Sequence, residues 1–568
     1  NGDGVADQKT LFFSGKAFLA NMEHQPSGLI WCMDNWIYSA VNSTRIRWTP
    51  QGVIKETTPS NGGQWGLTQD DDGKPWFING GSEIGPLNFQ QPIIYGAFRM
   101  KDESPPGFKE VFPLVAIPDV QGGAIRFRPQ EKTLNHFTAT CGNDIFRGDR
   151  LPKDLRGDLL FCEPVGRLVR RAKITSDDGI TRLSNAYPGS EFIRSTDPYF
   201  RPVNLATSPD GTLYLTDMYR GVIQQAQWIK PGSYLRGVVE GIGLQQHFGR
   251  GRIWRLVHDG FNPGPLPRMI EENVDQLVRY LEHPNGWWRD TAQRHLVLRQ
   301  DMSALPALRS LARSHASAVT RMHALWTLEG LNALDMSLVQ ETLNDADPRV
   351  RIAAMRAGES ILPRGHALFH GEIKTRLRSP EPEIAIQAML TLHRMKGDDA
   401  KRVIQEVGHT HPSRGVKEIA AQLTTPLSSQ LSLQSSGPQK ERLIEGQSIY
   451  LNLCFACHGF DGKGTPIPGS QATLAPALSN SPIVLGHADG TIRALLHGIA
   501  RPGGGEAGDG IMPPMGANDD AWIAAIVSYI RTGFGNTASM VTPEDVTKVR
   551  AEQAQRTEPW SREELLLR

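Results

Sequence analysis

The stretch Cys454-Phe455-Ala456-Cys457-His458 contains two thiols followed directly by an imidazole. This C-x-x-C-H spacing is typical of covalent haem c attachment, because each thiol can add to one vinyl group of a porphyrin. His458 is then the predicted axial ligand of the iron. The opposite ligand of such a haem is usually Met, whose thioether raises the reduction potential. Downstream, Ile511-Met512-Pro513-Pro514-Met515-Gly516 supplies Met512 as the predicted ligand and Met515 as the alternative.

The motif has two other interpretations, a structural zinc site and a redox dithiol. A structural zinc site needs four ligands, and no cysteine follows Cys457. A redox dithiol is expected beside a βαβ pattern, whereas a helical pattern precedes this motif and the glycine-rich stretch 459–464 follows it. A lone Met is most often core filler, but Met512 stands before two prolines and after the glycine-rich stretch 503–510. The pattern therefore favours a haem with both axial positions filled.

The residues around the motif resemble a class I cytochrome c domain over about residues 438–536, and we predict domain boundaries at 441–536. The similar segments are 445–450 for the first helix, 474–478 for a proline segment, and 521–531 for the closing helix. The resemblance implies that the carbonyl of Pro476 holds the ligand imidazole and so fixes its tautomer.

Bulk composition narrows the class of protein and its location. The chain has 568 residues and a net charge of +1, which argues against nucleic acid as a main partner. No apolar run approaches the roughly 20 residues of a transmembrane helix, and no signal peptide is visible. Haem is attached to C-x-x-C-H outside the cytoplasm in bacteria. We therefore expect a periplasmic or otherwise extracytoplasmic chain that is mature or trimmed.

Three cysteines lie outside the motif. Cys141 and Cys162 flank a predicted hairpin, and they either pair in an oxidising compartment or stay as two buried thiols. Cys32 lies in an apolar strand pattern and is predicted to be a small core residue.

Residues 1–262 carry short β-rich runs separated by turn signals, which predicts an all-β region. The runs include 29–39, 75–78, 159–162 and 212–216. Recurrent hairpins over so long a span favour blades of a β-propeller, with a β-sandwich as the alternative. Residues 1–7 are similar to part of a Ca²⁺-binding loop but lack the distal bidentate Glu, so a solvated turn is the other interpretation.

Three segments of this region resemble the soluble quinoprotein glucose dehydrogenase and aldose sugar dehydrogenase group: 24–29, 138–162 and 201–217. The resemblance implies that His24 is the general base for a sugar hydroxyl and that Arg201 contacts pyrroloquinoline quinone. The ordinary alternatives are a structural His and a carboxylate-paired Arg. The chain departs from the group at Val203 and near Gly62, where the relatives have cofactor-binding arginines. Because the relatives have their matching His well inside the propeller, we expect the early blades to be missing from this chain, and a second polypeptide is one possible source of them.

Residues 270–425 change to a helical period. Residues 274–281 place apolar groups at i, i+3, i+4 and i+7, and similar helices are predicted at 291–298, 318–328, 349–357 and 382–392. Turn signals at 345–351 and 379–383 suggest repeats of roughly 40 residues, as in an all-α HEAT-like solenoid; a compact helical bundle is the alternative. The aromatic-rich segment 283–290 is either core or a surface that contacts the β region.

The remaining segments are a Ser/Pro/Gln-rich linker at 426–440 and a helical tail at 537–568, which we expect to brace the haem domain. The order of domains, with segments 217–224 and 249–255, resembles large haem-binding dehydrogenase-like proteins of planctomycetes and verrucomicrobia. That resemblance implies oxidation of a sugar or alcohol at the propeller and electron transfer through haem c to a redox partner protein. The alternative function is a non-catalytic binding and electron-transfer subunit.

Overall fold

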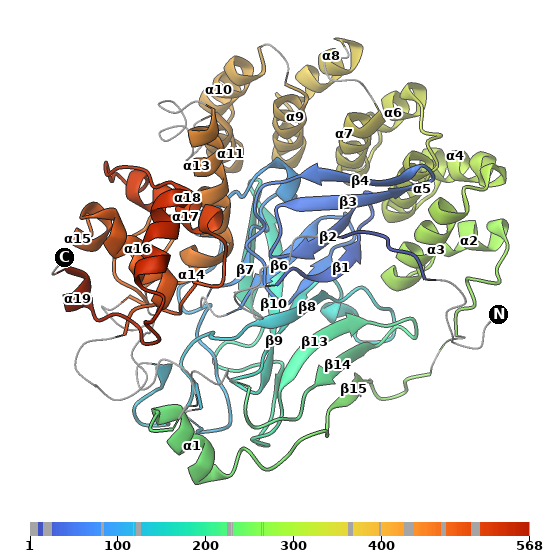
Figure 1. Ribbon diagram of the computed structural model, residues 1–568. Helices are drawn as coiled ribbons and strands as arrows, with labels where there is room; N and C mark the ends of the chain where they lie inside the picture. The colour runs from blue at the N-terminus through green and yellow to red at the C-terminus, as the bar shows by residue number, and fades with distance from the viewer. Residues whose placement is uncertain are drawn as a thin grey trace.

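The computed structural model describes residues 9–14, 25–80, 84–117, 119–120, 126–223, 229, 231–262, 264, 266–361, 367–396, 399–424, 437–466, 473–500 and 512–566. A sheet-rich N-terminal region is followed by a helical middle region and a helical C-terminal region (Figure 1). Among the helices in these ranges, none has the length and apolar character needed to cross a bilayer.

The described residues of the β region form four antiparallel sheets whose strands follow one another in the chain. The sheets are β1 (Ser27–Trp31), β2 (Ile37–Ala40), β3 (Thr44–Thr49) and β4 (Gly52–Thr57); β5 (Leu67–Gln69), β6 (Pro75–Asn79) and β7 (Gly85–Leu87); β8 (Cys141–Ile145), β9 (Leu159–Glu163), β10 (Leu168–Asp177) and β11 (Ile180–Asn185), with β12 (Ile193–Arg194) paired to β10; and β13 (Pro202–Thr207), β14 (Leu213–Asp217) and β15 (Arg252–Leu256). Asp178 and Gly179 both have positive φ, so the β10–β11 hairpin closes with the two-residue turn that matches strand twist.

The first strands of successive sheets lie next to one another. β1 contacts β5, β5 contacts β8, and β8 contacts β13. The carboxylate of Asp144 on β8 joins three of these strands, because it accepts from the Thr68 hydroxyl at 3.2 Å and from the Thr207 backbone N–H at 2.8 Å. Gly142 is required where β8 meets β13, since a Cβ there would lie 2.1 Å from the Val203 carbonyl oxygen.

The β-rich run 29–39 is not one continuous strand, because it is divided between β1 and β2. The chain turns back after Trp31, where the N–H of Cys32 donates to the carbonyl of Trp36 at 2.9 Å and Asn35 adopts a φ of 63°. Asx residues tolerate this left-handed conformation, so the run is the β1–β2 hairpin.

The middle region consists of helical hairpins. They are α2 (Val274–Tyr280) with α3 (Gly286–Arg299), α4 (Leu305–Ser314) with α5 (Ala318–Gly330), α6 (Met336–Thr342) with α7 (Pro348–Ile361), α8 (Ala367–Arg376) with α9 (Pro382–Met395), and α10 (Ala400–Thr410) with α11 (Arg414–Thr424). The starting residues of the second helices show that the repeat is roughly 30 to 34 residues, so the predicted period of about 40 was wrong. The turn signals at 345–351 and 379–383 lie inside hairpins rather than between them.

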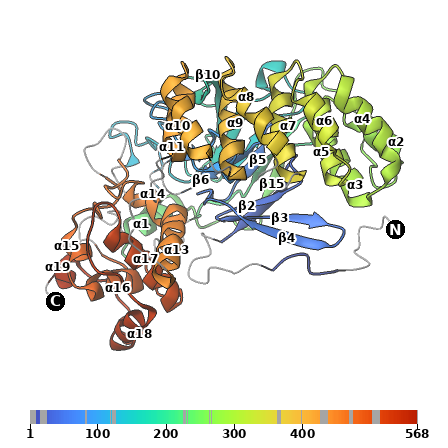
Figure 2. The ribbon, with the colours of Figure 1, turned by 90° about the horizontal axis from the view of Figure 1, so that it is seen from above.

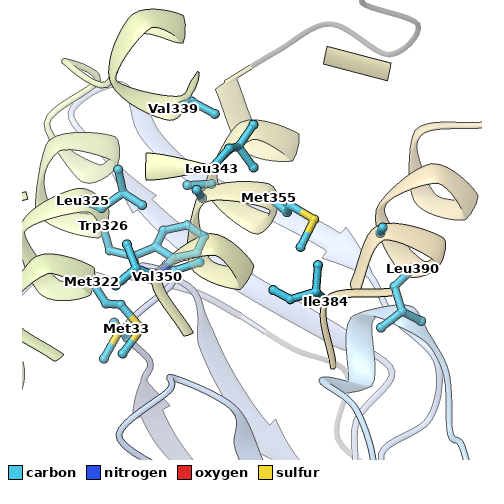
Figure 3. Packing of buried hydrophobic residues seen from close by; sticks show 14 of the residues in the cluster. Met33, Met322, Leu325, Trp326, Val339, Leu343, Val350, Met355, Ile384 and Leu390 are labelled. Carbon is cyan, nitrogen blue, oxygen red and sulfur yellow. The ribbon is translucent and has the colours of Figure 1, made fainter. Parts of the chain in front are cut away.

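Successive hairpins contact one another through their second helices, from α3 to α11. Seen from above, the helices of the middle region lie side by side in a row (Figure 2). Met33, in the β1–β2 turn, lies beside Met322 in the core shared with this row (Figure 3). The segment 283–290 also contacts the β region, because the indole N–H of Trp288 donates to the Pro209 carbonyl at 2.7 Å.

The C-terminal region begins with α13 (Pro438–Ile449), so the predicted linker 426–440 ends earlier than expected. It continues with η6 (Tyr450–Cys454), α14 (Phe455–His458), α15 (Pro482–Leu485), α16 (Ala488–His497), α17 (Asp520–Thr532), α18 (Pro543–Glu552) and α19 (Arg562–Leu566). α13 crosses α17 closely at Gly446, where a Cβ would lie 2.1 Å from the Ala525 carbonyl oxygen. This contact brings the two ends of the domain together and fixes the position of the C-x-x-C-H segment that follows α13.

Candidate haem site

The C-x-x-C-H segment lies on continuous helix. The π-helical turn η6 runs directly into α14, so Cys454 ends one element and His458 ends the next. Residues three apart on a helix lie on the same face, which places the two thiols on one side. Neither sulfur is in a disulfide; Cys454 is partly buried and Cys457 is exposed. This arrangement presents the two sulfurs to a single flat partner.

The imidazole of His458 is oriented by Pro476. Its Nδ1 lies 3.2 Å from the Pro476 carbonyl oxygen, the contact that the resemblance implied. When Nδ1–H donates to a carbonyl, the lone pair on Nε2 is left for a metal. Burial lowers the pKa of His458, which favours the neutral ring that can ligate iron.

The glycine-rich loop after His458 holds the proline segment in place. Gly464 has a φ of 90°, and a Cβ on it would lie 2.4 Å from the Ala475 carbonyl oxygen. The N–H of Leu478 donates to the Gly462 carbonyl at 2.7 Å. The loop therefore needs glycine both for its backbone conformation and for its close approach to residues 474–478.

Met512 and Met515 approach the same core as the motif. Met512 exchanges two backbone hydrogen bonds of 3.1 Å with Ile499, and the N–H of Met515 donates to the Leu495 carbonyl at 2.7 Å. Both methionines and Cys454 are partly buried against one hydrophobic cluster, which the C-terminal region shares with the β region. Met512 stays the predicted ligand and Met515 the alternative.

The donor set fits haem c. It offers two thiols that are not in a disulfide, one imidazole fixed at Nδ1 and two neutral thioethers. In the described parts of the chain, no group of three or more His, Cys, Asp or Glu side chains is placed to hold a metal ion. Residues 1–7, the predicted Ca²⁺ loop, lie outside the described residues.

The haem segment is packed against the β region. The hydroxyls of Ser43 and Ser448 lie 2.9 Å apart. An ideal Cβ on Gly62 would lie 3.5 Å from the Leu451 carbonyl oxygen. One hydrophobic cluster contains residues of both regions: Cys32, Tyr38, Phe77, Leu87 and Ile93 from the sheets, with Ile449, Tyr450 and Phe455 from the motif side. Figure 1 shows the C-terminal region beside β7.

Arg99 joins all three regions. Its guanidinium lies over the ring of Phe460, which packs on Phe455 with ring centroids 4.5 Å apart. Its backbone is held by Gln422 of α11, whose amide accepts from the Arg99 N–H at 3.2 Å and donates to its carbonyl at 2.9 Å. Burial lowers the pKa of Arg99 to about 9. Sequence reasoning missed Arg99, because no local pattern distinguishes it from a surface arginine.

Of the two predicted site residues of the β region, the structure describes Arg201 alone. His24 lies outside the described residues. Arg201 is fully buried and donates to the carbonyls of Pro164 at 2.9 Å and Gly221 at 2.5 Å, and to the carboxylate of Asp119. Its Nε donates to the Arg220 carbonyl at 3.0 Å. This is the carboxylate-paired alternative.

Pyrroloquinoline quinone does not fit the residues at the three positions that the resemblance assigns. Its three carboxylates call for charge-assisted partners. The donors of Arg201 are occupied within the protein, Val203 carries no charge, and Gly62 lies against the backbone of Leu451.

The remaining cysteines are core residues. Cys141 lies opposite Cys162 in the β8–β9 register, and both are buried and free. Burial raises the pKa of both thiols. Cys32 is also buried, as predicted, although it lies in the turn after β1.

Comparison with known families agrees with this division. Residues 443–534 match the cytochrome c family. This part of the chain is a cytochrome c domain. It implies covalently bound haem c and electron transfer with a redox partner. Residues 1–260 match a family described as a domain of unknown function, DUF7133. No curated protein matches the chain.

Proposed function

We propose that the chain is an extracytoplasmic haem c oxidoreductase whose β region and cytochrome c domain exchange electrons directly across their shared face. The observation that carries this proposal is the packing of the residues on either side of the C-x-x-C-H segment on the β region, through the Ser43–Ser448 and Arg99–Phe460 contacts. Electron transfer falls steeply with distance, and a packed contact gives a short path. A domain that only carried haem for a distant partner would not need this face buried.

Each residue of the cytochrome c domain has one role in the proposal. Cys454 and Cys457 tether the porphyrin, His458 and Met512 ligate the iron, and Pro476 fixes the imidazole. Haem c supplies reversible one-electron chemistry when it is bound. With both axial positions filled by the protein, oxygen chemistry is disfavoured.

The substrate assignment rests on resemblance. We propose that a sugar or alcohol is oxidised at the β region, with His24 taking the hydroxyl proton and an added quinone or other two-electron acceptor taking the hydride, whose electrons would then pass one at a time to the haem. The contacts between successive first strands support blades of a propeller, and a further chain or segment would complete it. We place the protein in the periplasm and assign the final electron to a soluble or membrane redox partner.

The second candidate is a relay subunit without its own catalytic centre. The specific observation in its favour is Arg201, each of whose three guanidinium nitrogens donates a hydrogen bond inside the protein. In that case the β region binds a partner enzyme, and the same packed face carries electrons onward.

Haem reduction by substrate separates the two candidates. Oxidised holoprotein would be mixed with a panel of aldoses and polyols, with and without added quinone, and the reduced haem band followed over time. Reduction that is lost in His24→Ala and retained in His258→Ala, an exposed His of the same region, supports the dehydrogenase. Absence of reduction with every sugar and quinone supports the relay.

A further inference from the structure

The chain beyond the cytochrome c match folds back onto the loop that carries the two methionines. On α18, the guanidinium of Arg550 donates to the Gly516 carbonyl, to the Asn518 carbonyl at 2.8 Å and to the Asp520 carboxylate at 2.8 Å. Gly516 directly follows Met515. One arginine of the tail therefore holds both the end of this loop and the start of α17.

A second tail contact reaches Met512 through the backbone. The N–H of Trp560 donates to the Gly498 carbonyl at 3.1 Å, and the N–H of Ala500 donates to the Trp560 carbonyl at 2.8 Å. Ile499, between them, pairs on its other side with Met512. The backbone segments at Met512, Ile499 and Trp560 therefore lie side by side, with Ile499 in the middle and the tail on the outside.

The tail is itself firmly anchored. Val541 accepts from and donates to the Ser528 hydroxyl of α17 at 3.0 Å. α18 begins with a reciprocal capping box between Thr542 and Asp545. Trp560 is 5% exposed, and the guanidinium of Arg556 lies 3.5 Å from its ring centroid. A segment fixed in this way can transmit restraint to the loop that it contacts.

We propose that residues 541–560 form a clamp that keeps the methionine sulfur on the haem iron, with Arg550 and Trp560 as positioning residues. A thioether is a neutral ligand, so its retention depends on how strongly its loop is held. The planar fork of Arg550 matches two carbonyls and a carboxylate at once, which a lysine ammonium cannot do with the same geometry. This inference rests on the haem ligation of the proposed function.

The direct test compares Arg550→Gln with Lys548→Gln. Lys548 is exposed on the same helix, so its variant removes the same charge without touching the loop. We expect Arg550→Gln to bind imidazole at the ferric haem about tenfold more tightly than Lys548→Gln, a difference of about 1.4 kcal/mol. The sulfur-to-iron charge-transfer band should weaken in Arg550→Gln and stay unchanged in Lys548→Gln. Arg550→Lys should resemble Arg550→Gln, because the charge is kept and the fork is lost.

Equal imidazole affinity in Arg550→Gln and Lys548→Gln, with unchanged charge-transfer bands, would overturn the clamp. The reduced haem band in the same samples separates failure of the clamp from failure of the proposed function. If haem is present but the two variants behave alike, only the clamp is contradicted. If the wild-type protein is colourless, the proposed function is contradicted.

A measurement on the wild-type protein covers the case in which Arg550→Gln does not fold. Hydrogen exchange of the peptides containing Met512 and Trp560 would be measured with and without imidazole. The clamp predicts that both peptides lose protection together when imidazole displaces the sulfur. Loss of protection at Met512 with an unchanged Trp560 peptide would contradict it.

Discussion

The cytochrome c domain and the β region use their charged and polar side chains in opposite ways. In the cytochrome c domain, the hydrogen bond between His458 Nδ1 and the Pro476 carbonyl orients the ring and leaves Nε2 available to a metal. In the β region, Arg201 donates to three carbonyls and a carboxylate. His458 keeps one ring nitrogen available for ligation, whereas Arg201 uses its hydrogen bonds to hold the fold together. A residue's type therefore suggests a role, but the partners it has already bound decide whether that role is open.

The largest expected effect is on the haem side of this comparison. Met512→Ala should lower the midpoint potential by on the order of 0.2 V, since axial ligation sets haem potentials over about 0.8 V, and should let imidazole bind. Met515→Ala is the matched control and should change the potential little. A potentiometric titration followed by the reduced haem band measures both variants, and the reverse pattern would assign the ligand to Met515.

On the other side, Arg201→Leu should destabilise the β region by about 3 kcal/mol, because it leaves buried carbonyls unpaired and weakens the pairing of Asp119. The haem potential should not move. Urea unfolding with Arg194→Leu as control tests this; Arg194 is exposed, and its variant should stay within about 0.5 kcal/mol of the wild type. A stable Arg201→Leu protein that fails to reduce its haem with substrate would instead make Arg201 a ligand-binding residue.

A smaller effect is expected from Asp144, which joins the first strands of three sheets. Burial raises its pKa from 3.8 to about 6. A raised pKa in the folded state means that folding favours protonated Asp144. The stability that Asp144 contributes is therefore fully present below about pH 4 and is lost as the pH rises through 6. The free energy of unfolding of the wild type, relative to Asp144→Asn, should fall by about 2 kcal/mol between pH 4.5 and 7.5. A pH-independent difference in urea unfolding would remove Asp144 as the cause.

The smallest effect concerns the contact between the two regions. Arg99→Gln removes the cation over Phe460, which is worth about 0.5–2 kcal/mol. Peptides covering 455–464 should exchange hydrogen faster than in Lys101→Gln, a control at an exposed neighbouring position. Equal exchange would mean that the Ser43–Ser448 contact and the shared hydrophobic cluster are sufficient for docking.

How much the sequence could predict follows the same division. The haem motif and Pro476 depend on residues close in the chain, so spacing and resemblance placed them. The role of Arg201 depends on Asp119, which lies 82 positions away, and the role of Arg99 depends on Gln422 and Phe460. No local pattern encodes such contacts. The helical period was misjudged because short first helices such as α2 and α6 shorten each repeat.

The central claim is that this chain carries one covalent haem in a domain packed on its β region. Intact mass spectrometry of protein made in a host that attaches haem c, followed by dithionite reduction, tests it most directly. The account predicts the mass of the polypeptide plus one haem and a sharp reduced alpha band, both lost when Cys454 and Cys457 are replaced by Ala. A colourless protein with the mass of the bare polypeptide would contradict it.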